Sequence, residues 1–301
     1  MANISAMSYI KGPDFYVFPF VINEKNGKSR TIITYQNTRT GQQFRKWHEE
    51  VLKTIRYFYK SNPHSYAYRK KVSCKNAIDD HLKSNCFIKL DIHSFFESIS
   101  YDAFLKEGYP LISKYFNEKE VESLFYKSHL SLGYVTSPIV SDLYMHSFDE
   151  DVAAFIKFKP HLHYSRYCDD ILISSEQDDF AELEALQSFI EKALSNKGLS
   201  LNKKKEKREH LEFKAHNSLS FLGLNLSKKE DGTNKVTISK HFILKLLDML
   251  GTYYDNYPKC NFVFKNNILS RLAYIKHNSQ ESYQRFLKKH LNRFHKEYKG
   301  I

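Results

Sequence analysis

The chain has 301 residues, of which 42% are hydrophobic and 15% aromatic, so it can bury a large core or several packed subdomains. Its formal net charge of +12 favours a polyanionic partner, most often a nucleic acid. The sequence has no apolar run of the roughly 20 residues that a membrane span needs, no signal-peptide pattern and no Cys or His spacing typical of zinc sites. We therefore expect a cytoplasmic protein with reduced thiols and no membrane partner.

The N-terminal part alternates between strand and helix patterns. Residues 15–23 and 27–36 are typical of two strands joined by a glycine turn. Apolar residues at helical spacing from Phe44 to Ile55 then predict a helix. Residues 86–96 form an apolar run with polar residues near its end. This is the pattern of a buried strand that delivers a side chain to a site.

The middle of the chain predicts a helix, a strand hairpin and a second helix. Residues 136–155 begin with a Thr-Ser-Pro helix-start signature, in which the hydroxyl residues cap the helix and proline takes an early helical position. Residues 163–175 are typical of strand, tight turn and strand, with Asp169 and Asp170 at the turn. An amphipathic helix over residues 180–198 closes with a glycine.

The C-terminal part predicts a hairpin followed by helices. Residues 220–239 form the hairpin, which turns at Asp231 and Gly232. Residues 237–301 predict three helices and carry 12 Lys and Arg against 4 Asp and Glu, so most of the basic charge is concentrated there. The buried stripe of the first of these helices is expected to contain Ile243, Leu246, Leu247 and Leu250.

Three aspartates in this pattern indicate phosphoryl transfer. Asp91 ends an apolar strand, and Asp169 and Asp170 occupy a hairpin tip with apolar flanks. Nucleotidyl transfer uses a pair of divalent cations, and Mg²⁺ prefers carboxylate ligands. Neighbouring carboxylates repel each other, and a bound cation relieves that repulsion. Because an Asp-Asp pair taken alone is most often a solvated turn, the interpretation depends on the surrounding motifs.

Those motifs resemble the motifs of reverse transcriptases. YCDD looks like their catalytic box, and LDIHSFFESI like the strand that holds their first aspartate. Within this family the chain most resembles the bacterial retron and defence-associated enzymes. The resemblance rests on SYAYRKK followed by Asn-Ala, on the two successive Phe residues after the first aspartate, and on the small size of the chain. The matching segments occur in the family's order and are GKSRTII, SYAYRKK, LDIHSFFESI, LGYVTSPIVSDL, YCDD, LSLNKKK and FLG, which begin at residues 27, 65, 90, 132, 167, 199 and 221.

The resemblance implies an α+β fold of the right-hand polymerase type. Residues 1–85 would form the fingers, residues 86–235 a palm with an antiparallel sheet, and residues 236–301 a basic helical thumb. It also implies RNA-directed DNA synthesis on a dedicated noncoding RNA, in a bacterial antiphage defence system. The expected partners are that RNA, its DNA product, dNTPs and an effector protein.

The family's catalytic residues map onto four positions. Asp91, Asp169 and Asp170 would bind the metal ions, which the resemblance implies to be a pair of Mg²⁺ ions, with Mn²⁺ as the alternative ion. Lys205, the lysine of the family's N-x-x-K segment, would act as a general acid towards the pyrophosphate leaving group.

The resemblance also assigns residues to the substrates. Arg30 and Arg69 would grip the triphosphate through paired hydrogen bonds. Phe96 would stack under the sugar and exclude a 2′-hydroxyl, and Thr136 and Ser137 would shape the turn under the template base. The residues expected at the primer and the template are Tyr167, Cys168, Phe221, Leu222, Gly223, Lys288, Lys289 and Arg293.

Three alternatives stay open. An RNA-synthesising polymerase or a nucleotidyl cyclase could use a related palm, although Phe96 disfavours ribonucleotides and the template turn disfavours a cyclase. A template-independent polymerase is the second, because Leu132 and Val135 replace the usual Gln and Pro of the template turn. The third is a non-catalytic RNA-binding scaffold, which would have no need of three intact aspartates.

Overall fold

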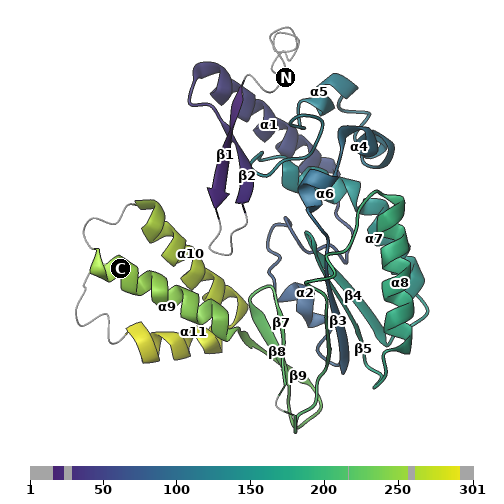
Figure 1. Ribbon diagram of the computed structural model, residues 1–301, viewed down its shortest axis with the longest axis vertical. Helices are drawn as coiled ribbons and strands as arrows, with labels where there is room; N and C mark the ends of the chain where they lie inside the picture. The colour runs from purple at the N-terminus through teal and green to yellow at the C-terminus, as the bar shows by residue number, and fades with distance from the viewer. Residues whose placement is uncertain (1–15, 24–28, 216, 257–261, 292–301) are drawn as a thin grey trace.

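The computed structural model describes residues 16–23, 29–215, 217–256 and 262–291. A two-stranded sheet with a long helix lies at one end of the molecule, a four-stranded sheet backed by helices lies beside it, and a three-stranded sheet leads into the C-terminal helices (Figure 1). No helix in these described ranges is both long and apolar enough to cross a membrane.

The first unit consists of β1 (Val17–Asn23), β2 (Ser29–Tyr35) and α1 (Arg39–Phe58). The strands pair antiparallel, and the glycine turn predicted between them lies outside the described residues. Thr38 caps α1 by accepting a hydrogen bond from the Gly41 amide at 3.1 Å. Packing of α1 against the strands creates a small aromatic core, which contains Tyr16, Val17, Ile33, Phe44 and Tyr134.

The four-stranded sheet has the order β4–β5–β3–β6, and all of its neighbouring strands run antiparallel. Its strands are β3 (Cys86–Asp91), β4 (Leu162–Tyr167), β5 (Asp170–Ser175) and β6 (Lys207–His210). Because successive side chains of a strand face opposite ways, the apolar runs supply a core to each face. One core packs against helices α7 (His146–Ile156) and α8 (Ala181–Asn196), and the other faces the three-stranded sheet.

Several short helices connect these strands, and two of them correct the predictions. They are α2 (Asn76–Asp79), α3 (Phe95–Ser98), α4 (Tyr101–Glu107), η3 (Tyr109–Leu111), α5 (Glu118–Glu122) and α6 (Ser137–Tyr144). The helix expected over residues 136–155 is two helices, because the chain breaks at Met145, where ψ is 0°. Phe95 and Phe96 lie on a helical turn, whereas the sequence pattern placed them at the end of a strand.

The three-stranded sheet and the C-terminal helices share one core. Strands β7 (Leu219–Phe221), β8 (Leu224–Lys228) and β9 (Asn234–Ile238) form a meander. The predicted turn at Asp231 and Gly232 joins β8 to β9, and a second turn, at Leu222 and Gly223, joins β7 to β8. The helices are α9 (Lys240–Asp255), α10 (Phe262–Asn278) and α11 (Gln280–Phe286), followed by a π-helical turn, η4 (Leu287–Leu291).

The stripe predicted for α9 is confirmed. Leu246 and Leu250 are fully buried, and Ile243 and Leu247 pack at the edge of the same core. That core includes Phe87 and Leu172, which lie on the face of the four-stranded sheet opposite α7 and α8. The C-terminal helices are therefore anchored through β7–β9 to the sheet that carries the aspartates.

Candidate active site

Two of the three aspartates stand opposite each other in the four-stranded sheet. Asp91 is the last residue of β3 and is paired in register with Asp170, the first residue of β5. Directly opposed residues of an antiparallel pair point to the same face, with Cβ atoms about 4.5–5.5 Å apart. The backbone of Asp169 is held beside this pair, because its carbonyl accepts a hydrogen bond from the Ile92 amide at 2.9 Å. The sheet therefore gathers all three predicted positions at one end.

The turn between β4 and β5 is tight and strained. Tyr167 pairs with Asp170, so Cys168 and Asp169 alone form the turn, and Cys168 has a φ of 62°. A positive φ at the first turn residue is the pattern of a type II′ hairpin turn, which usually has glycine there. A non-glycine residue in that region costs about 1–3 kcal/mol and persists where the surroundings impose it. We call residues 167–170 the carboxylate turn.

Cys168 is held inside the turn as a neutral thiol. Its Sγ accepts a hydrogen bond from the Tyr68 hydroxyl, and burial raises the pKa of the Cys168 thiol to about 12. A thiol whose pKa is raised in this way is mostly protonated at neutral pH, and the protonated form is a weak nucleophile. Its expected position beside the primer end stays a prediction.

Lysines neutralise two of the carboxylates. Lys205 Nζ lies 2.6 Å from Asp91 Oδ2, and Lys89 Nζ lies 3.4 Å from Asp170 Oδ1. Lys205 is brought there by the chain itself, because the Asn202 amide donates to the Asp91 carbonyl at 2.7 Å. Burial raises the pKa of Asp170 above its usual range; Lys89 opposes the shift and the neighbouring carboxylates add to it.

The donor set fits Mg²⁺ in chemistry, although the described residues hold no group of three Asp, Glu, His or Cys side chains close enough to bind an ion. Two carboxylates share one face at the end of a rigid sheet, and hard oxygen donors of this kind suit Mg²⁺. The ammonium groups of Lys89 and Lys205 neutralise these carboxylates, as a bound metal ion would. The three-aspartate metal site therefore stays a prediction, and ligation of an ion requires these lysines to release the carboxylates.

The predicted template turn packs between β2 and α6. Ile33 donates its amide to the Leu132 carbonyl at 2.7 Å, and Gly133 follows with a φ of 109°. Thr136 precedes α6 but does not cap it with its side chain, which corrects the capping prediction. In the described structure the buried Thr136 Oγ1 has no hydrogen-bond partner, and Ser137 Oγ donates to the Ser131 carbonyl at 2.6 Å.

The three residues expected at the incoming nucleotide occupy different surroundings. Phe96 is half-buried beside the core, whereas Phe95 is buried in it. Arg69 donates to the carbonyls of Pro63 and Ser65, so its guanidinium lies against the segment that precedes it. Arg30 lies exposed on β2, which belongs to the two-stranded sheet. The two arginines therefore lie on different parts of the structure.

The predicted primer grip forms the turn between β7 and β8. Leu222 and Gly223 have φ values of 52° and 80°, the pattern of a type I′ turn. Tyr274 of α10 donates its hydroxyl to the Leu222 carbonyl, so a C-terminal helix holds this turn. The Phe221 ring is 5.6 Å from Lys89 Nζ, which connects the turn to Asp170.

The predicted basic tail residues occur at the C-terminal end of the described residues and beyond it. Lys288 and Lys289 are part of η4, and Arg293 lies outside the described residues. Their expected contact with a template–primer duplex stays a prediction.

Sequence patterns did not reveal a buried arginine beneath the carboxylate turn. Arg166 is fully buried and ion-paired with Asp142 of α6 and Asp149 of α7. Two signals in the sequence point to it in retrospect: an arginine inside a strand buried on both faces needs acidic partners, and the two aspartates are seven residues apart, close to two helical turns.

Comparison with known proteins connects the chain to one family. The family described as "Reverse transcriptase (RNA-dependent DNA polymerase)" matches residues 22–226. The retron Ec86 reverse transcriptase of Escherichia coli is 24% identical over 196 residues, which is 64% of this chain and 58% of that protein. The retron Ec83 reverse transcriptase of the same organism is 29% identical over 122 residues, which is 36% of this chain and 39% of that protein.

Solved structures show the same fold. The apo telomerase of Candida tropicalis has a TM-score of 0.55 at 14% identity, covering 96% of this chain and 59% of that chain. The Candida albicans telomerase in complex with a fragment of telomeric RNA has a TM-score of 0.51 at 14% identity, covering 97% and 59%. At this identity the likeness concerns the fold alone, and together with the family match it confirms the predicted α+β right-hand polymerase fold.

Proposed function

This chain belongs to the reverse transcriptase family, and from that membership we propose that it is an RNA-directed DNA polymerase that copies a dedicated noncoding RNA into DNA. The matched part spans little more than half of one retron relative and less of the other, so the activity of the whole protein is inferred. The observation that carries the proposal is the in-register pair of Asp91 and Asp170 at the end of the sheet, beside the strained turn that holds Asp169.

In the proposed reaction the chain orients a primer hydroxyl towards the α-phosphate of a bound dNTP. Divalent cations held by Asp91, Asp169 and Asp170, most simply Mg²⁺ or Mn²⁺, would activate that hydroxyl and stabilise the leaving phosphates. Lys205 is 49% exposed and can swing from Asp91 towards the pyrophosphate, to which it would donate a proton.

The substrate contacts complete the proposal. Phe96 is half-buried beside the core, consistent with a ring under the nucleotide sugar. Arg30 and Arg69 would bind the triphosphate, Thr136 and Ser137 would support the template base, and the turn at Leu222 and Gly223 would guide the primer end. We also propose that residues 1–85, 86–235 and 236–301 act as fingers, palm and thumb.

The partners follow from the same relatives. The two matched Escherichia coli proteins are retron reverse transcriptases, so we propose that the template is a structured noncoding RNA, that an effector protein acts with the enzyme, and that the system serves in antiphage defence in the bacterial cytoplasm. The basic tail, with 12 Lys and Arg against 4 Asp and Glu over residues 237–301, suits a nucleic-acid partner.

The test is to purify the protein with its bound nucleic acid, sequence that nucleic acid, and supply dNTPs or rNTPs separately with Mg²⁺. The proposal predicts one dominant RNA and a DNA extension complementary to it. Ribonucleotide incorporation would support an RNA polymerase, non-complementary extension a template-independent enzyme, and RNA binding without any synthesis a scaffold. Each of these three results contradicts the proposed function.

A further inference from the structure

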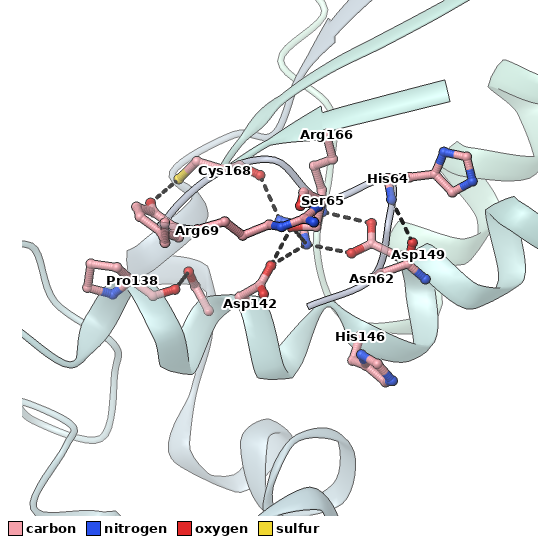
Figure 2. Close-up of polar contacts among 12 residues, drawn as sticks. Asn62, His64, Ser65, Arg69, Pro138, Asp142, His146, Asp149, Arg166 and Cys168 are labelled. Carbon is pink, nitrogen blue, oxygen red and sulfur yellow. Dashed lines mark hydrogen bonds and ion pairs between the residues drawn. The ribbon is translucent and has the colours of Figure 1, made fainter. Parts of the chain in front are cut away.

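Directly beneath the carboxylate turn lies a buried charged cluster made of Arg166, Asp142, Asp149 and Ser65. Arg166 Nε and Nη2 lie 2.8 and 2.5 Å from the two carboxylate oxygens of Asp149. Nη2 also lies 2.9 Å from Asp142 Oδ1 and 3.0 Å from Ser65 Oγ. Figure 2 shows the guanidinium with Asp142 and Asp149 on two sides of it. The cluster joins β4, helices α6 and α7, and a loop from the N-terminal part of the chain.

The cluster is charged even though it is excluded from water. Burial by itself raises the pKa of Asp142, but the Arg166 charge and its hydrogen bonds hold that pKa below the usual range. The carboxylates in turn raise the pKa of Arg166 well above its usual value, against the effect of burial. A buried ion pair is weak evidence for a purely stabilising role, because its desolvation cost offsets much of its attraction.

Arg166 also contacts the carboxylate turn itself. Its Nη1 donates to the Cys168 carbonyl at 3.2 Å, and Cys168 is the turn residue with positive φ. Because alternate residues of β4 face opposite ways, Arg166 lies on the helix side of the sheet while Tyr167 faces the side of the aspartates. The guanidinium thus holds the peptide between Cys168 and Asp169 from below (Figure 2).

The same residue fastens the 62–69 segment, which carries Tyr68 and Arg69. Its backbone amide donates to the His64 carbonyl, and its carbonyl accepts from the Tyr66 amide, both at 2.9 Å. The Tyr68 hydroxyl then reaches Cys168 from the side. Arg166 therefore fixes the position of the 62–69 segment relative to the carboxylate turn.

We propose that Arg166 is a positioning residue for the reaction proposed above, on which this inference rests. By fixing the Cys168 carbonyl, it sets the direction of the Asp169 and Asp170 carboxylates and their distance from the 62–69 segment. In this role it acts through the turn and not by contact with the substrates or the metal ions. A planar fork that satisfies two carboxylates, a hydroxyl and a carbonyl together is specific to arginine, since lysine offers one ammonium group.

The test compares Arg166→Lys with Arg208→Lys. Arg208 lies on β6 of the same sheet and is ion-paired with Glu184 and Glu206, but it is exposed. Each variant is examined by thermal melting, by Mn²⁺ binding followed through the EPR signal of the free ion, and by the Mg²⁺ and dNTP dependence of primer extension. The Mn²⁺ titration needs no catalytic activity, so it tests the positioning role even if the wild type makes no DNA.

For Arg166→Lys we expect Mn²⁺ affinity to fall about ten-fold, as when the outer partners of metal ligands are removed. The half-saturating Mg²⁺ concentration should rise to match, with a lower kcat that high Mg²⁺ partly restores and a smaller change in the KM for dNTP. Arg208→Lys should match the wild type. If Arg166→Lys binds Mn²⁺ as the wild type does and loses activity only in proportion to its unfolded fraction, the residue is structural and the proposal is overturned.

A milder variant covers the case in which Arg166→Lys does not fold. Ser65→Ala removes one acceptor of the Arg166 guanidinium and one donor to Asp142 while leaving both charges in place. We expect a weakening of Mn²⁺ binding of about three-fold, the effect of one hydrogen bond transmitted to the turn. Unchanged Mn²⁺ affinity in folded Ser65→Ala, combined with a failure of Arg166→Lys to fold, would overturn the positioning role in favour of stability alone.

Discussion

Replacing Gly133 with alanine should destabilise the protein more than the same replacement at the other glycines that the structure describes. A Cβ at Gly133 would lie 2.3 Å from the Ile33 carbonyl oxygen and 2.8 Å from a methyl of Ile32. Its φ of 109° is also unfavourable for any side chain, at a cost of about 1–2 kcal/mol. Relieving the overlap adds about 1–3 kcal/mol, since a backbone carbonyl cannot move aside as a side chain does.

The expected loss is therefore about 2–5 kcal/mol, which corresponds to a fall of about 3–8 °C in the melting temperature of a chain of this size. The affected interaction is the hydrogen bond from Ile33 to Leu132, which docks the predicted template turn on β2. We accordingly expect templated synthesis to fall further than the folded fraction does.

Two control variants separate backbone strain from overlap in the same melting assay. Gly232 has a φ of 79° and no atom near an added Cβ, so Gly232→Ala should cost only about 1 kcal/mol. Gly251 lies in α9 with open space around it, so Gly251→Ala should gain up to about 1 kcal/mol. If Gly133→Ala melts no lower than Gly232→Ala, the close approach of β2 to the template turn is not present in solution.

Three further predictions concern the substrates. Phe96→Ala should reduce the preference for dNTPs over rNTPs about ten-fold or more, because the volume that excludes a 2′-hydroxyl disappears; an unchanged ratio of kcat/KM for the two substrates would leave Phe96 as a core residue. Tyr274→Phe removes the hydroxyl that is hydrogen-bonded to the Leu222 carbonyl, so we expect the free energy of unfolding to fall by about 1 kcal/mol. We also expect shorter products in an extension assay limited to one encounter between enzyme and template. Tyr57→Phe is the control, because Tyr57 is highly exposed. Products of wild-type length from Tyr274→Phe would contradict the link between α10 and the primer. Reversing Lys288, Lys289 and Arg293 to Glu should make the plot of log K against log salt shallower by about one unit for each phosphate that the tail no longer neutralises, while single-nucleotide addition at saturating template is spared; equal slopes would mean that the tail does not touch the nucleic acid.

The parts of the site that depend on one strand or one turn could be predicted from sequence. The apolar runs before Asp91 and after Asp170 predicted buried strands, and buried antiparallel strands bring their ends together in a defined register. The leucine stripe of α9 was predicted for the same reason, since helical periodicity is local.

Features that depend on distant parts of the chain could not be predicted. The break at Met145 has no proline or glycine to signal it, and the helical turn at Phe95 follows Ser94, whose φ of 44° is unusual for serine. Arg166 looked like one polar residue in a strand, because its partners Asp142 and Asp149 come from helices elsewhere in the chain. The pairing of Lys205 with Asp91 likewise spans 114 residues.

The most direct test of the proposed active site is primer extension on an RNA template by the wild type and by Asp170→Asn, with Asp151→Asn as control. Asp151 is an exposed residue of α7, so its replacement removes the same charge from the solvent-facing side of that helix. We expect Mg²⁺-dependent DNA synthesis by the wild type and the control. We expect none by Asp170→Asn, with melting temperature and RNA affinity close to those of the wild type. Near-normal synthesis by Asp170→Asn would contradict the assignment of the active site.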